Sequence, residues 1–369
     1  MGGNGAAVSP ARLQRAQREM ARQGIDLLVV GPSPDLAYLT GNGGHLSERL
    51  SLLLVPRDGG ATYVVPRFEA PLLGRQRDLA AVRTWEETED PAALAATVAG
   101  PVGGKTVAVA DQLWSVFLLR LQAAMPGARW IGSGDLLRPL RMTKDAAEIA
   151  TMREAARRTD VAWETFRHRS IVGLSEREAI AQLLELTAEQ GLGVSWGICA
   201  SGPNAASPHH VAGDRKIEPG DAVVFDWGGT LDGYHSDITR TVWVGPDPDP
   251  EYVAVYGTVL AANRAALAAV RPGVPCEAVD RAARDVIEAA GHGAAFIHRT
   301  GHGLGLDIHE EPYLVAGNTL PLAAGMVFSD EPGIYLAGRF GVRVEDTVVC
   351  TETGGECISH ARRELTTMA

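Results

Sequence analysis

The chain has 369 residues, which is long for one hydrophobic core and sufficient for two domains. A hydrophobic fraction of 46% and a charged fraction of 21% are typical of a soluble globular protein. The formal net charge of −11 argues against binding to nucleic acid through surface charge. It also fits a protein whose clustered carboxylates are neutralised by bound cations.

The four cysteines form no C-x-x-C pair and are too few for a disulfide framework in a chain of this size. We interpret them as reduced, mostly buried thiols, with a bridge between Cys350 and Cys357 as the alternative. The first residues contain no signal-peptide core, and Ala6 stands where a myristoylation motif needs Ser or Thr. No apolar run is long enough to cross a bilayer. A cytoplasmic protein without a membrane partner is therefore expected.

The first part of the sequence alternates helix-like and strand-like segments, which predicts a small α/β domain. It contains no G-x-G-x-x-G, no P-loop and no nucleophile elbow. Such a domain would shape the substrate site or support dimerisation. The expected elements are a helix at 10–23, a strand at 25–30, a hairpin of 50–55 with 61–65 around Asp58-Gly59-Gly60, a strand at 106–110 and a helix at 113–124.

The pattern changes near residues 138–144, which predicts domains at 1–140 and 141–369. Asp145 begins a long helical pattern that continues towards Phe166, and Ser175-Glu176-Arg177-Glu178 fits a capping box. Helices outside and strands in the middle predict an α+β domain. The further elements expected are helices at 251–270 and 276–290 and strands at 222–226, 239–244, 327–331 and 342–351.

Two aspartates flank a predicted hairpin. Asp226 ends an apolar segment, and Asp237 follows in the sequence Ser-Asp-Ile-Thr-Arg. The glycine-rich residues 228–233 between them predict a hairpin, which places its flanks side by side. A carboxylate at the end of an apolar strand needs a partner or a cation if it is buried. Taken alone, the pair also fits a turn aspartate and a surface aspartate.

A glycine-rich stretch over residues 298–312 contains His298, His302 and His309. Its glycines let the backbone fold closely and leave the imidazoles uncrowded. A single histidine is more often a structural residue than a ligand. Three in so short a stretch favour a site.

Two glutamates lie at or within predicted strands. Glu331 ends a strand-like segment, and Glu345 lies within residues 342–351. Period-two alternation places Arg343 and Glu345 on the same face of that strand. The alternative for Glu345 is a salt bridge with an arginine, which is cheap on a surface and costly inside a sheet.

Together these residues form an oxygen-rich ligand set of four carboxylates and one imidazole: Asp226, Asp237, His302, Glu331 and Glu345. The set suits Mn²⁺, with Co²⁺, Zn²⁺ or Fe²⁺ as alternatives, and it lacks the thiolates of a structural zinc site. Two divalent ions would roughly balance four carboxylates. A pair of bridged metals generates hydroxide from a shared water and polarises a carbonyl, as amide hydrolysis requires.

In their order and local contexts, these five residues resemble the pita-bread metallopeptidases: Xaa-Pro dipeptidases (prolidases), aminopeptidase P and methionine aminopeptidase. The resemblance covers about residues 140–360 and rests on D-x-G…S-D-x-T-R, G-H-G-x-G-L-x-x-H-E-x-P, D-E-P-G-x-Y and R-x-E-D. It implies an α+β pita-bread catalytic domain in residues 141–369. The preceding domain is similar to the smaller α/β domain of creatinase-like proteins.

The resemblance also implies residue roles. Asp226 would bind one metal, His302 and Glu331 the other, and Asp237 and Glu345 would bridge both. The side chains expected around the substrate are His209, which would contact it or stabilise the tetrahedral intermediate, His309 at the substrate end of the site, and Glu331 as proton shuttle. Those expected beside the substrate or behind the ligands are His298, Tyr335 and Arg343. His210, His235 and His292 are interpreted as structural.

The N-terminal domain favours the Xaa-Pro branch over methionine aminopeptidase, and creatinase keeps the fold without this metal set. The resemblance therefore implies a homodimeric enzyme that hydrolyses the bond before proline, whose tertiary amide has no N–H and a fixed geometry. A short proline-containing peptide is the expected partner, either a dipeptide or, as for aminopeptidase P, a longer chain. A related metallohydrolase or a non-catalytic binding protein would also fit the fold.

Overall fold

The computed structural model describes residues 10–194 and 196–369. The chain divides into two compact units, with the boundary between Arg141 and Met142. In the part of the chain that is described, no helix has the length and apolar character needed to cross a membrane. All four cysteines are free, so Cys350 and Cys357 form no bridge.

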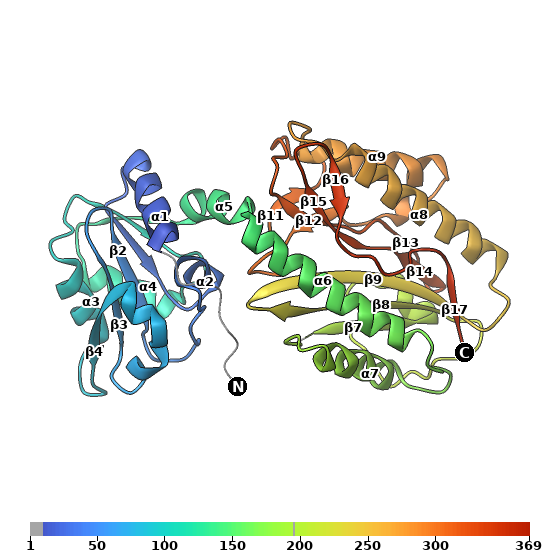
Figure 1. Cartoon of the computed structure of the whole chain (residues 1–369), viewed down its shortest axis with the longest axis horizontal. Helices are drawn as coiled ribbons and strands as arrows, with labels where there is room; N and C mark the ends of the chain where they lie inside the picture. Colours follow the sequence, from blue (N-terminus) through green and yellow to red (C-terminus); the bar gives the residue numbers. More distant parts are fainter. Residues whose placement is uncertain (1–9, 195) are drawn as a thin grey trace. The chain divides into compact units, whose positions relative to one another are not determined.

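The first unit is built on a mixed six-stranded sheet with the order β4-β3-β2-β1-β5-β6 (Figure 1). The predicted hairpin is present, because β2 and β3 pair antiparallel from Leu52 opposite Val64 to Leu54 opposite Thr62. Its elements are α1 (Pro10–Gln23), β1 (Leu27–Val30), α2 (Pro34–Thr40), β2 (Leu52–Pro56), β3 (Ala61–Pro66), the 3₁₀ helix η1 (Ala70–Asp78), β4 (Ala80–Trp85), α3 (Pro91–Ala99), β5 (Thr106–Val109), α4 (Ser115–Ala124), β6 (Arg129–Gly132) and α5 (Gly134–Met142).

The second unit begins with a helix pair on an antiparallel sheet with the order β17-β9-β8-β7. The two helices start at Asp145 and Ser175, as predicted. The capping box predicted at Ser175 is present, and Asp145 forms a second one with Glu148. Figure 1 shows α6 crossing this sheet, and Trp163, Phe166 and Phe225 pack in the core between helix and strands. The elements are α6 (Ala146–Phe166), α7 (Glu176–Glu189), β7 (Gly197–Ser201), η2 (Gly202–Ala206), β8 (Ala222–Leu231), β9 (Tyr234–Val244) and β17 (Thr366–Met368).

A second helix pair, α8 and α9, packs on a second antiparallel sheet with the order β11-β10-β12-β15-β16. Between β12 and β15 in the chain, β13 and β14 form a separate two-stranded hairpin. These elements are α8 (Pro250–Ala269), α9 (Cys276–Ala289), η3 (Gly293–Ala295), β10 (Gly301–Gly303), β11 (Glu310–Leu314), β12 (Val327–Asp330), β13 (Gly333–Leu336), β14 (Phe340–Arg343), β15 (Asp346–Cys350) and β16 (Gly355–Cys357).

The prediction of a single strand over residues 342–351 was wrong in one respect. The chain forms two strands there, because β14 ends at Arg343 and β15 begins at Asp346. There the chain leaves the β13–β14 hairpin and joins the ladder with β12. At the crossing point, Glu345 forms an isolated antiparallel bridge with Thr239 of the other sheet. This contact joins the two sheets, and the site residues gather around it.

Candidate metal centre

Asp226 and Asp237 lie on the hairpin of β8 and β9, as the glycine-rich segment between them predicted. Leu231 pairs with Tyr234, so the turn contains only Asp232 and Gly233, with φ of 49° and 86°. Positive φ at both central residues is the signature of a type I′ hairpin, which matches the twist of its strands.

The hairpin register sets the distance between the two carboxylates. Asp226 pairs with Thr239, and Gly228 pairs with Asp237, so the aspartates lie on adjacent strands two positions apart. A Cβ at Gly228 would lie 1.8 Å from the carbonyl oxygen of Ser236. Only glycine permits this close approach of the strands.

The other three proposed ligands come from the second sheet or its margin. His302 is in β10, Glu331 directly follows β12, and Glu345 precedes β15. Ser329 links the first two, because its Oγ accepts from His302 N at 2.9 Å and donates to Glu331 Oε1 at 3.2 Å. Thr239 Oγ1 donates to Glu345 Oε2 at 2.6 Å. Ser329 therefore holds the His302 backbone and the Glu331 carboxylate, and Thr239 holds the Glu345 carboxylate.

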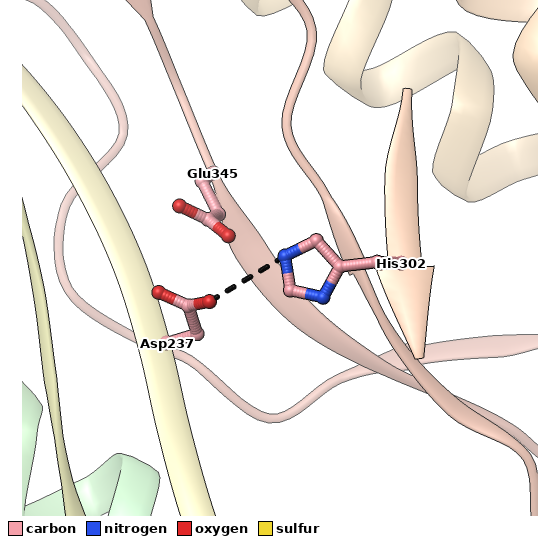
Figure 2. A group of neighbouring side chains, drawn as sticks. All are labelled: Asp237, His302 and Glu345. Atoms are coloured by element: carbon pink, nitrogen blue, oxygen red, sulfur yellow. Dashed lines mark ion pairs between the residues drawn. The ribbon is translucent and has the colours of Figure 1, made fainter. Parts of the chain in front are cut away.

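Asp237, His302 and Glu345 point towards one another from the two sheets, as Figure 2 shows. One ligand atom of each lies within 4.8 Å of the others. His302 Nε2 is 3.6 Å from Asp237 Oδ2 and 3.3 Å from Glu331 Oε1. Nitrogen and carboxylate oxygens converging in this way form a donor set for a divalent metal.

The imidazole of His302 is prepared for coordination. Its Nδ1 lies 3.1 Å from the carbonyl oxygen of Gly303, which only accepts, so Nδ1 carries the proton and Nε2 has a free lone pair. Burial, with the neighbouring His309, lowers the pKa of His302 to about 3. The ring is therefore neutral, as a metal ligand must be.

The carboxylates are buried and crowded. Burial raises the pKa of Asp237 and Glu345 well above the usual range, and their neighbouring carboxylates raise it further. Burial also raises the pKa of Glu331 to about 7. Within the described residues, one carboxylate oxygen of Asp226 and one of Asp237 are buried without a hydrogen-bond partner. Buried unpaired carboxylates are costly unless a cation compensates them, so this donor set fits divalent ions.

Arg343 lies behind the ligands. Its side chain is 3% exposed, and Nη2 contacts Asp226 Oδ2 at 2.6 Å. The same guanidinium donates to Thr239 Oγ1 at 3.0 Å and to Tyr335 Oη at 2.8 Å. It therefore fixes one carboxylate ligand directly and Glu345 through Thr239.

Both ring nitrogens of His298 are engaged. Nδ1 lies 2.7 Å from the carbonyl oxygen of Arg299, so it carries the proton, and Nε2 accepts from Tyr335 Oη at 2.8 Å. Burial and the nearby Arg343 lower the pKa of His298 to about 4. His298 is thus a neutral ring fixed by hydrogen bonds.

The site residues surround one cavity of about 480 Å³. Of the residues predicted from the sequence, all line it except Tyr335, which lies behind the wall on His298 and Arg343: Asp226, Asp237, His302, Glu331, Glu345, His209, His309, His298 and Arg343. The imidazole of His309 stacks near His302, with ring centroids 4.0 Å apart.

Five lining residues were missed by the sequence interpretation: Trp196, Ile198, Pro208, Arg299 and Ile308. The apolar members carry no pattern that distinguishes a cavity wall from a core. Arg299 had a signal, because it directly follows His298 in the glycine-rich stretch. Its guanidinium lies over the ring of Tyr313, 4.2 Å from the centroid.

Comparison with known proteins decides the family. Residues 150–352, more than half of the chain, match the sequence profile of metallopeptidase family M24. The chain belongs to metallopeptidase family M24. In this M24 chain, residues 12–143 also match the creatinase/prolidase N-terminal domain.

Several relatives resemble the M24 chain over nearly its whole length. The probable dipeptidase PepE of Mycobacterium tuberculosis (strain ATCC 25618 / H37Rv) is 41% identical over 367 residues, which cover 98% of this chain and 96% of that protein. A recombinant prolidase structure from Thermococcus sibiricus is 37% identical, with a TM-score of 0.93, and the match covers 98% of this chain and 100% of that one. An X-Pro aminopeptidase structure from Thermotoga maritima is 30% identical, with a TM-score of 0.87, covering 97% and 99%.

These findings confirm the predicted fold class, a pita-bread catalytic domain preceded by a creatinase-like α/β domain. They also confirm that the chain is a metallopeptidase, which implies that it binds a divalent metal.

Proposed function

We propose that this metallopeptidase hydrolyses the bond before proline in dipeptides, using two divalent ions. The observation that carries the proposal is the convergence of four carboxylates and one neutral imidazole on the wall of a single cavity. The names of its relatives, dipeptidase and prolidase, favour this substrate class.

Asp237 and Glu345 would bridge the two ions. They come from opposite sides of the Thr239–Glu345 bridge, and each has a ligand atom within 4.8 Å of the other. Asp226, oriented by Arg343, would complete one ion's ligands, and His302 with Glu331 would complete the other's. The oxygen-rich set favours Mn²⁺ over metals that prefer thiolate ligands.

When bound, such ions lower the pKa of a water molecule and polarise a carbonyl oxygen, which supplies the nucleophile and the electrophile of hydrolysis. The protein must then move a proton. Glu331 suits this role because its carboxylate lines the cavity and lies 3.3 Å from His302 Nε2, beside the proposed ligands. We propose that Glu331 takes the proton of the attacking water and delivers it to the proline nitrogen that leaves.

His209 and His309 would act on the substrate itself. Both side chains are exposed and line the cavity. An imidazole N–H aimed at the substrate carbonyl would stabilise the negative charge that develops on its oxygen.

The cavity wall also offers a place for the ring and for the far end of the substrate. Trp196, Ile198 and Ile308 give an apolar surface that suits a pyrrolidine ring. Arg299 lines the same cavity, and among the described residues no acidic side chain lies within ion-pairing distance of it. An arginine free to form a bidentate pair suits the terminal carboxylate of a dipeptide. This favours a dipeptidase over an enzyme for longer chains.

A length series tests the proposal. Protein stripped of metal and reloaded with Mn²⁺ is assayed on an Xaa-Pro dipeptide, its C-terminal amide, an Xaa-Pro-Yaa tripeptide and an Xaa-Ala dipeptide. The highest kcat/KM is expected for the Xaa-Pro dipeptide. Preference for the tripeptide would favour an aminopeptidase P activity, and preference for Xaa-Ala would exclude the proline specificity. Inactivity on all four, with metal bound, would favour another substrate class or a binding role.

A further inference from the structure

Glu176, the first residue of α7, carries a carboxylate that the proposed mechanism does not use. Glu176 is fully buried, at 0% exposure. A buried carboxylate is costly unless several donors satisfy it. Its donors are Ser201 N at 2.8 Å, Ser201 Oγ at 2.8 Å, Asn204 Nδ2 at 2.9 Å, His210 Nε2 at 2.7 Å and Gly213 N at 3.0 Å.

All of these donors belong to residues 201–213, the segment that carries His209. The two carboxylate oxygens of Glu176 accept from different parts of this segment. Oε1 binds Ser201 and Asn204 before His209, and Oε2 binds His210 and Gly213 after it. One side chain therefore holds both ends of the segment.

The segment has little regular structure of its own. After the short helix η2 it forms a turn, in which His210 N donates to Ser207 O at 3.2 Å. Its tip is exposed, with Val211 84% accessible. On the cavity side, Arg343 Nη1 donates to Pro208 O at 3.4 Å, a long contact. The Glu176 carboxylate thus provides much of what orders this segment.

The second helix pair offers a comparison within the same unit. Gly173 N donates to Ile217 O before α7, and Gly273 N donates to Leu322 O before α9. One turn later, Glu176 N donates to Arg215 O, and Cys276 N donates to Leu320 O. The two halves therefore share this local architecture, and the position of Glu176 is taken in the second half by Cys276.

Cys276 is also 0% exposed, so this architecture forms without a carboxylate at that position. The corresponding segment of the second half carries His309, and there β11 pairs with β10 directly after it. The buried ion pair of Lys144 Nζ with Glu310 Oε1, at 2.6 Å, adds a further anchor. The His209 segment has no such strand, and Glu176 takes its place.

We propose that Glu176 and His210 are positioning residues, which hold the segment 201–213 so that His209 faces the cavity. The inference rests on the role proposed above for His209. Burial disfavours the charged form of Glu176, but hydrogen bonds from Asn204, Ser201, Gly213 and His210 hold its pKa below the usual value. The carboxylate therefore remains a double acceptor at neutral pH.

The test uses the full chain reloaded with Mn²⁺ and an Xaa-Pro dipeptide. We call the hydrogen bonds between the Glu176 carboxylate and residues 201–213 the clamp. Glu176→Gln replaces one of the two accepting oxygens, and His210→Asn removes one donor because asparagine is too short to reach Glu176. Both should lower kcat by at least about tenfold, with KM and metal content near wild type. His210→Gln restores a donor at the right reach and should recover most of the loss. Glu178→Gln, on the same helix but exposed, controls for helix capping and should stay within about twofold of wild type.

A double-mutant cycle separates this inference from the role of His209. His210→Asn should have little further effect when combined with His209→Ala, because it acts through that residue. Additive losses would overturn the clamp, as would wild-type kcat in His210→Asn. If His209→Ala alone leaves kcat unchanged, the catalytic role proposed for His209 is wrong, and the positioning role of Glu176 and His210 is overturned with it. Should Glu176→Gln fail to fold, His210→Asn decides alone, since its side chain is partly accessible.

Discussion

Arg343 Nη2 lies 2.6 Å from Asp226 Oδ2, and the two side chains are only 3% and 13% exposed. The same guanidinium reaches Thr239 and Tyr335, so it needs its planar fork to make all three contacts. One arginine therefore connects a proposed ligand of one metal with the residue that holds Glu345.

Arg343→Lys keeps the positive charge but removes the planar guanidinium that makes the three contacts. It therefore tests whether the orientation of Asp226, rather than the charge beside it, matters for metal binding. We expect metal affinity to fall roughly 10- to 100-fold, as is typical when the partner that orients a ligand is lost. Competition with a metal-binding dye measures the affinity. Arg339→Lys in the same β13–β14 hairpin, where the arginine pairs with Glu251 at the surface, is the matched control. Equal affinity in both variants would show that Arg343 does not orient Asp226.

Asp237→Asn should reduce bound metal below half of the wild-type amount and abolish turnover, because Asp237, if it bridges two ions as proposed, would serve both. Metal analysis after reconstitution, together with a dipeptide assay, measures both effects. The control is Asp232→Asn in the turn of the same hairpin, where asparagine tolerates the positive φ of 49°. Wild-type metal content in Asp237→Asn would contradict the bridging role.

The close approach of β8 and β9 gives a third prediction. Gly228→Ala places a Cβ against the carbonyl oxygen of Ser236, so the strands must separate and carry Asp226 and Asp237 apart. We expect a loss of roughly 3 kcal/mol in unfolding free energy, together with reduced metal content. Gly257→Ala in α8 has open space around its Cβ and should instead stabilise by roughly 1 kcal/mol. Urea unfolding of both variants checks the opposite signs.

The pKa of Glu331 predicts a pH dependence for the metal-free protein. Burial raises that pKa from 4.5 to about 7, so the folded chain keeps a proton that the unfolded chain has lost. The contribution of Glu331 to stability is then fully present below about pH 4.5 and is lost as pH rises to about 7, by about 1.4 kcal/mol per pH unit. The buried neutral rings of His302 and His298, with pKa values of about 3 and about 4, contribute the opposite slope, so the Glu331 contribution is the difference between wild type and Glu331→Gln. Urea unfolding of chelated protein at several pH values measures the slope.

The glutamine side chain in Glu331→Gln cannot titrate, so this variant lacks the Glu331 contribution. Between about pH 4.5 and 7 its slope of unfolding free energy against pH should differ from that of wild type by about 1.4 kcal/mol per pH unit. With saturating Mn²⁺ the unfolding free energy should rise with pH, because metal and protons compete for the same carboxylates. An equal pH slope in the chelated wild type and in Glu331→Gln would contradict the assignment.

Parts of the site followed from local sequence, and those parts were predictable. Residues 228–233 are a turn sequence, so the hairpin that sets Asp226 beside Asp237 could be inferred from composition. Period-two alternation put Arg343 and Glu345 on one face, and both line the cavity. In each case the information lies within a dozen residues.

Other parts depend on contacts between distant segments. Thr239 and Glu345 meet across 106 positions, and this bridge interrupts the strand that local alternation predicted as continuous. Glu176 lies inside the predicted capping box of Ser175 and Glu178 and carried no signal of its own, whereas its carboxylate binds residues of the segment 201–213. Trp196 and Ile308 are ordinary apolar residues until the fold brings them to the same wall.

We expect Arg299 to bind the free carboxyl end of a dipeptide substrate. Its guanidinium lies against Tyr313 and lines the cavity, and the loss of an arginine–carboxylate pair typically costs about 1.5–3 kcal/mol. Arg299→Met should therefore raise KM for an Xaa-Pro dipeptide by at least about tenfold. The C-terminal amide of the same dipeptide is the matched control, because it has no charge to lose and its KM should change little.

Arg299→Lys keeps the charge without the fork and should give an intermediate KM for the dipeptide. Equal losses for the acid and the amide would mean that Arg299 supports the cavity wall rather than the substrate. An unchanged KM for the acid would mean that the carboxylate is bound elsewhere. Only a loss confined to the acid assigns the dipeptide end to Arg299, because the two substrates differ in that group alone.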